Sequence, residues 1–149
     1  MSSGLYVALG AVLVALVAGG VLALRNGRFR GTHAVRGAET GPEEVAVPVL
    51  AGSPWEEQLG ERATLLQFSS AFCAPCRSTR RILAEVAEQV PGVSHVEVDA
   101  EHHLDVVRRL GILRTPTTLV LDADGHEVVR ASGAPTKVQV YDALAAALP

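Results

Sequence analysis

The two cysteines of this 149-residue chain, Cys73 and Cys76, are its most evident source of chemistry. A thiolate is the nucleophile in disulfide exchange, and a second thiol close by can resolve the mixed disulfide that forms. Zinc or copper binding is the alternative, but such sites normally need two further ligands at short spacing, and the chain has no other cysteine. The spacing therefore favours dithiol–disulfide exchange, with metal binding as the alternative.

The segments on either side of the pair predict where the thiols lie. A strand-like apolar run covers residues 65–68, and apolar residues at helical spacing follow the pair at Ile82, Leu83, Val86 and Val90. This order places the thiols at the N-terminus of a helix. There, free amide groups and the positive end of the helix dipole favour an anion, so Cys73 should ionise more readily than a free cysteine.

The neighbouring residues fit that position. Pro75 falls in the first helical turn, where its missing N–H costs little, and Arg77 adds positive charge nearby. Cys73 is predicted to attack a substrate disulfide. Cys76, one turn further on and more sheltered, is predicted to resolve the mixed disulfide.

A separate apolar segment occupies the N-terminus. After a short tail of residues 1–4, residues 5–24 contain no charge, and as a helix they would cross about 30 Å of hydrocarbon. A cleaved signal peptide is the competing interpretation. The tail has no Lys or Arg, the apolar run is long and no A-x-A site is evident, so we predict a single transmembrane helix.

Charge next to this helix predicts its orientation. No Lys or Arg precedes it, whereas four arginines follow it closely, at positions Arg25, Arg28, Arg30 and Arg36. The positive-inside rule then places the rest of the chain in the cytoplasm, and an extracytoplasmic domain is the alternative. Residues 25–44 are rich in Gly, Arg and Glu, which predicts a flexible linker whose arginines can also meet membrane lipid.

Residues 45–149 are predicted to form one α/β domain. A short edge strand is expected over 45–50, and Ser53, Pro54 and Glu56 have the form of a helix start, opening a short helix to about residue 59. The last helix, 136–148, is expected to bury a stripe formed by Val138, Tyr141, Leu144, Ala145 and Leu148. The other elements expected are strands at 65–69, 93–99, 118–121 and 127–130, a helix from the cysteines to residue 90, and a helix at 102–110.

The cysteine segment resembles the active site of the thioredoxin family. Members typically carry Trp-Cys-Gly-Pro-Cys followed by Lys or Arg, and this chain has Phe72-Cys73-Ala74-Pro75-Cys76-Arg77. Two further matches are Thr115-Pro116-Thr117 and Asp124-Gly125 followed by Gly133. The resemblance covers residues 45–149 and implies the thioredoxin fold, a central mixed β-sheet flanked by helices.

The resemblance also implies a substrate site. The proline matching Pro116 is cis in the family and lies against the cysteines, so the Thr115 backbone is expected to pair with an extended substrate segment beside Cys73. Phe72 and Ala74 depart from the usual Trp and Gly. Gln67 stands where the family has a buried acid, and because an amide cannot exchange protons, deprotonation of Cys76 would need water or another base.

The implied activity is reduction of protein disulfides by a membrane-tethered oxidoreductase that needs no cofactor beyond its own cysteine pair. The implied partners are protein disulfides and an electron donor such as a thioredoxin reductase or a membrane thiol carrier. An extracytoplasmic role in cytochrome maturation or secreted-thiol redox control is the alternative, as is non-enzymatic copper or zinc binding. A net charge of −3 leaves no basic footprint, so nucleic acid is not expected as a partner.

Overall fold

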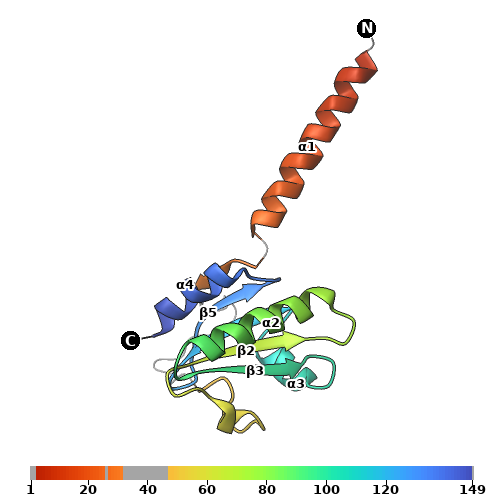
Figure 1. Cartoon of the computed structure of the whole chain (residues 1–149). Coiled ribbons are helices and arrows are strands. Elements are labelled where there is room, and N and C mark those ends of the chain that lie inside the picture. The colour runs from red at the N-terminus through yellow and green to blue at the C-terminus, as the bar shows by residue number, and fades with distance from the viewer. Residues whose placement is uncertain (1–2, 26, 32–46, 149) are drawn as a thin grey trace, which may run out of the picture.

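The computed structural model describes residues 3–25, 27–31 and 47–148. It contains a long N-terminal helix and a small α/β domain (Figure 1). The helices are α1 (Ser3–Arg25), α2 (Ala74–Gln89), α3 (Leu104–Arg109) and α4 (Lys137–Ala147), with a single 3₁₀ turn, η1 (Glu56–Gln58). The strands are β1 (Phe29–Gly31), β2 (Ala63–Ser69), β3 (Val93–Asp99), β4 (Thr117–Asp122) and β5 (Glu127–Ser132).

The strands form one mixed sheet in the order β1-β5-β4-β2-β3. β2 and β3 are parallel, and the other pairings are antiparallel. Every side chain of β2 is buried, as expected for a central strand covered on both faces. The predicted architecture, a mixed sheet flanked by helices, is confirmed.

Helices α2 and α4 cover one face of the sheet (Figure 1). The stripe predicted for α4 is wrong in part, because Val138 and Ala145 are exposed whereas Val140 and Ala143 are buried. Apolar residues occur on several sides of α4, so their spacing does not define a single face. Packing against α2 and the sheet decides which side of α4 is buried.

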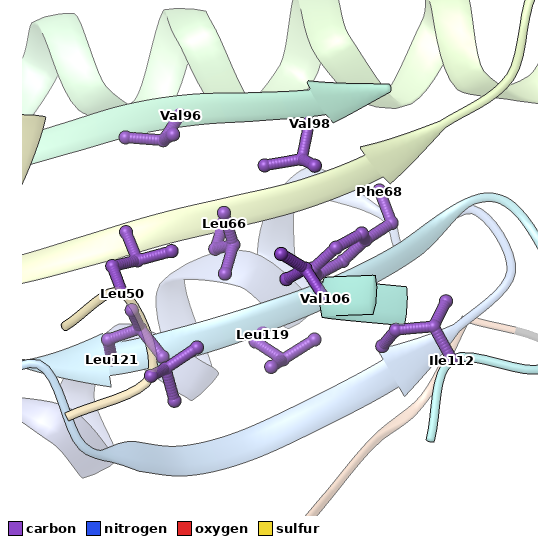
Figure 2. Close-up of a cluster of buried hydrophobic side chains, with 10 residues drawn as sticks. Leu50, Leu66, Phe68, Val96, Val98, Val106, Ile112, Leu119 and Leu121 are labelled. Carbon is purple, nitrogen blue, oxygen red and sulfur yellow. The ribbon is translucent and has the colours of Figure 1, made fainter. Parts of the chain in front are cut away.

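The other face of the sheet packs against α3 and the segment before β2. Figure 2 shows this second cluster, in which Leu66 and Phe68 of β2 meet Val106 of α3, with Leu50 and Ile112 at its margins. Phe68 contributes an aromatic ring that is fully buried. The strand that leads to the cysteines is therefore anchored by core packing on both faces.

The segment at 47–59 differs from the prediction. Residues 49 and 50 lie in a turn and are buried, so the expected edge strand is absent from the described part of 45–50. The predicted capping box is wrong, because η1 has Trp55 as its N-cap with no side-chain cap. The side chains of Ser53 and Glu56 make other contacts, since Ser53 Oγ accepts from the Trp55 N–H and Glu56 accepts from the Gly52 N–H. They support only the single turn η1, because the chain must then enter β2.

The sheet edge is formed instead by β1, which pairs antiparallel with β5. This strand falls inside the segment predicted to be a flexible linker. Arg25 belongs to α1, residues 29–31 form β1, and residues 32–44 lie outside the described residues. The linker predicted from composition is thus interrupted by a strand directly after the apolar helix.

Candidate active site

Cys73 and Cys76 are joined by a disulfide at the start of α2, with their Cα atoms 5.2 Å apart. Cys73 is partly exposed, whereas Cys76 is only 2% exposed. An incoming sulfur can therefore reach Cys73 more easily than Cys76. This asymmetry matches the roles predicted for an attacking and a resolving thiol.

Cys73 is also the N-cap residue of α2. Its Sγ accepts a hydrogen bond from the Cys76 N–H at 3.1 Å, and Pro75 lies in the first turn as expected. The Cys76 N–H at the helix start thus points at the sulfur of Cys73. In the reduced state this amide and the helix dipole favour the thiolate over the thiol.

A second loop lies beside the disulfide loop. The Thr115–Pro116 peptide bond is cis, and the Pro116 carbonyl accepts from the Gly133 N–H at 2.7 Å. The hydroxyl groups of Ser70 and Thr115 are 2.9 Å apart, which links the cysteine loop to the proline loop. The fold thus brings together two loops that lie about 40 residues apart in the sequence, and the hydrogen bond between Ser70 and Thr115 has no signal in the sequence.

The disulfide also borders a pocket of 410 Å³ between α2 and the end of β3. Its charged lining is contributed by both elements: Arg77, Arg80, Glu97 and Asp99. Arg80 and Glu97 form an ion pair at 2.6 Å. Of these four residues, only Arg77 belongs to the cysteine motif and is predicted from the sequence. The other three belong to no motif, and they come together only because β3 packs beside α2.

Two large apolar side chains, one in the cysteine loop and one just before the proline loop, are strongly exposed. Phe72 precedes the first cysteine and is 99% exposed, and Leu113, two residues before Thr115, is 95% exposed. Exposed apolar groups at a reactive site are suited to contact a protein partner. The sequence motif points to Phe72 as a residue of the active-site loop, whereas no motif in the sequence points to Leu113.

The described residues include one cluster with metal-ligand chemistry, formed by Asp122, Asp124 and His126 in the β4–β5 turn. Asp122 Oδ1 already accepts from the backbone N–H groups of Asp124 and His126. These contacts stabilise a tight turn and need no ion. The cluster lies at the end of β4 opposite to Thr117, so it does not adjoin the cysteines.

Comparison with known proteins decides the family. The family model for thioredoxin matches residues 46–146, which is most of the chain. The chain belongs to the thioredoxin family. Its sequence is similar to thioredoxin H2-1 of Oryza sativa, with 29% identity over 64% of this chain and 72% of the relative. It is also similar to mitochondrial thioredoxin-2 of Schizosaccharomyces pombe, with 30% identity over 52% of this chain and 57% of the relative.

Solved thioredoxin structures show the same fold. The thioredoxin of Fasciola hepatica superposes with a TM-score of 0.54 and 25% identity, covering 62% of this chain and 86% of that one. The thioredoxin of Nicotiana alata gives 0.54 and 24% identity, covering 60% and 76%. The chain spans 60% of the length of thioredoxin H10 of Arabidopsis thaliana, another relative it matches.

Gln67 of β2 lies next to the start of α2, close to Cys76. It is fully buried, and its Nε2 donates to the Cys76 carbonyl at 3.0 Å and to Ser69 Oγ at 2.8 Å. Its Oε1 lies 3.3 Å from Nε2 of His95 on β3. The amide therefore has partners on both ends, which explains how a polar side chain is accommodated beneath the disulfide.

His95 is the titratable group in contact with this amide. Burial lowers the pKa of His95 below its ordinary value near 6.5; nearby Glu97 opposes this shift and Arg80 adds to it. The unfolded state then binds a proton more readily than the folded state. The contribution of His95 to stability is present above pH 6.5 and is lost as the pH falls through 6.5 and below.

Replacing His95 with Asn is expected to weaken this pH dependence. Urea unfolding at pH 5.0 and pH 7.5 would measure the difference in unfolding free energy between the two pH values. We expect that difference to be smaller in H95N than in the parent chain. The matched variant H102N should change it in the opposite direction, because a hydrogen bond to Asp99 raises the pKa of His102. An unchanged difference in H95N would contradict the assignment.

Proposed function

We propose that this chain is a thiol–disulfide oxidoreductase that reduces protein disulfides through the Cys73–Cys76 pair. The observation that carries the proposal is the disulfide itself, with a partly exposed sulfur at the helix start and a buried sulfur behind it. Membership of the thioredoxin family supports the same chemistry. The cysteine pair serves as the redox centre, and no other cofactor is proposed.

The steps follow from the exposure of the two sulfurs. The Cys73 thiolate attacks a substrate disulfide, forms a mixed disulfide and releases the first substrate thiol. The Cys76 thiol loses its proton and attacks Cys73, which regenerates the Cys73–Cys76 disulfide and releases the second substrate thiol. The backbone of Thr115, before cis-Pro116, pairs with the extended substrate segment during the exchange. Phe72, Ala74, Pro75 and Arg77 shape the loop around the reacting sulfur.

A donor must then return two electrons to the disulfide. We propose a thioredoxin reductase or a thiol carrier in the membrane for this role. The basic test is reduction of insulin by dithiothreitol in the presence of the full chain in detergent. Catalysis is expected, and a rate equal to that of dithiothreitol alone would refute the proposed activity.

We also propose that α1 anchors the domain to a membrane. Residues 6–23 are long and apolar enough to span a bilayer, and none of them is buried inside the structure. A signal sequence would have the same composition. The arginines that follow the helix support a cytoplasmic position for the domain, with lipid head groups beside them.

Cell fractionation tests the anchor and its orientation. The full chain with a C-terminal tag is expected to remain in the membrane pellet after alkaline carbonate extraction, at its full length. In intact protoplasts the tag should resist protease and become sensitive only after lysis. A shortened, extractable chain would indicate a cleaved signal, and cleavage of the tag without lysis would place the domain outside the cytoplasm.

A further inference from the structure

The connection between α1 and the sheet is short and closely packed. Only residues 26–28 separate Arg25, the last residue of α1, from Phe29, the first residue of β1. The N–H of Gly27 donates to the Ser132 carbonyl at 3.0 Å. Gly27 is buried with a φ of +73°, and a Cβ at this position would lie 2.1 Å from the Ala134 carbonyl oxygen. The domain is thus attached directly after the helix.

This attachment lies at the same end of the sheet as the cysteines. β1 begins opposite Ala131, close to the end of β5. The last residue of β5, Ser132, pairs with Thr117 at the start of β4, and Thr117 pairs with Phe68 near the end of β2. Cys73 follows β2 by a few residues. The pairing of these four strands therefore places the end of α1 and the active site at the same end of the sheet.

The distances involved are small. Arg25 and Gly27 are two residues apart, so their Cα atoms are separated by at most about 7 Å. Ser132 and Phe68 lie on strands two positions apart, which places them about 10 Å from each other. With the hydrogen bond between Gly27 and Ser132, Phe68 is within roughly 20 Å of the last residue of α1.

The surface at this end is suited to a protein partner. Phe72, next to Cys73, and Leu113, two residues before Thr115, are almost fully exposed, and Val138 at the start of α4 is 69% exposed. The β4–β5 turn and the Pro91–Gly92 turn lie at the opposite end of the sheet. A partner that covers Phe72 therefore approaches the end of the sheet at which β1 begins.

We propose that the disulfide partner of this chain is a protein held in the same membrane, with its cysteines close to the bilayer surface. The inference rests on the proposed oxidoreductase activity and on the membrane position of α1. In the exchange, the reduced Cys73–Cys76 pair supplies two electrons, the S–S bond of the partner breaks, and the two thiol protons pass to the released sulfurs. The short connection restricts the pair to disulfides near the membrane.

Proteoliposomes that contain the full, pre-reduced chain provide the test. The probes are two synthetic single-span peptides, each with a dye attached through a disulfide. In the low probe the disulfide lies at the head-group level, and in the high probe a rigid helical spacer of about 30 residues raises it by about 45 Å. We expect dye release from the low probe to be at least about tenfold faster, because its effective concentration at Cys73 is higher. Equal rates, or a faster high probe, would overturn the inference.

Two glycine variants provide a matched comparison. In G27A, the added Cβ is expected to clash with the Ala134 carbonyl and detach β1 from β5, which lengthens the connection between α1 and the domain. The preference for the low probe should then fall below about threefold. Gly52 has a similar φ of +69° with open space around its Cβ position, so G52A should retain the preference. An unchanged preference in G27A would contradict the role of the docked connection.

Insulin reduction in detergent separates the two proposals. Insulin is soluble, so its disulfides are not held at a fixed distance from a membrane. Both glycine variants should therefore reduce insulin at the rate of the parent chain. If the parent chain does not reduce insulin, the proposed activity fails. If it reduces insulin but does not discriminate between the probes, only the membrane-held partner is refuted.

Discussion

Replacing Cys73 with serine is expected to lower insulin reduction by this chain to the uncatalysed rate. Cys73 is the partly exposed sulfur of the pair, and its Sγ receives the Cys76 N–H at the start of α2. A hydroxyl group in this position cannot form a mixed disulfide, and buried Cys76 is not accessible to a large substrate. The measurement is the initial rate of insulin precipitation with dithiothreitol.

Replacing Cys76 with serine should give a different result. Cys73 can still attack, but the mixed disulfide has no resolving thiol, so a covalent adduct with the substrate should accumulate. Non-reducing electrophoresis and mass spectrometry would detect the adduct, and excess dithiothreitol would release it. Full turnover by C73S, or an adduct formed by C73S but not by C76S, would contradict the assigned order of attack.

The largest effect on stability is expected from replacing Phe68 with alanine. Phe68 is fully buried on β2 and packs with Val106 and Ile112 in the cluster beneath α3 (Figure 2). Removal of a buried aromatic ring typically costs about 3–5 kcal/mol, through lost transfer free energy and the cavity that remains. Urea unfolding of the chain, followed by far-ultraviolet circular dichroism, would measure the loss.

Phe72 provides the matched control for this prediction. It is four residues further along the chain and 99% exposed, so replacing it with alanine should change the unfolding free energy by no more than about 0.5 kcal/mol. A loss of similar size in both variants would show that the effect of F68A does not come from core packing. A loss below about 1 kcal/mol in F68A would show that the cluster collapses around the missing ring.

The sequence alone determined the chemistry of the cysteine pair and the order of the elements from β2 to α4. The cysteine spacing, the apolar strand before it and the helical spacing after it place two thiols at a helix start, and the structure has them there. These features are local, because each depends on residues within a few turns of one another. The same is true of β3, whose observed bounds match the predicted strand.

Only the tertiary structure decided how distant residues meet. The contacts of Gln67 with Cys76 and His95, and of Ser70 with Thr115, depend on the pairing of strands and on how α2 packs over them. A sequence pattern cannot reveal these contacts, because hydrogen bonds between segments leave no periodic signal. The buried side of α4 was misjudged for the same reason, since apolar residues occur around much of the helix.

The strand β1 shows this limit most clearly. Three residues in a Gly- and Arg-rich segment have no strand signal of their own, and composition predicted a flexible linker. They form a strand because the open edge of β5 offers unpaired backbone groups and because Gly27 allows close contact with Ala134. The sequence could therefore predict a redox domain with an apolar helix. The attachment of that helix at the same end of the sheet as the active site follows from long-range backbone pairing, which only the folded chain makes.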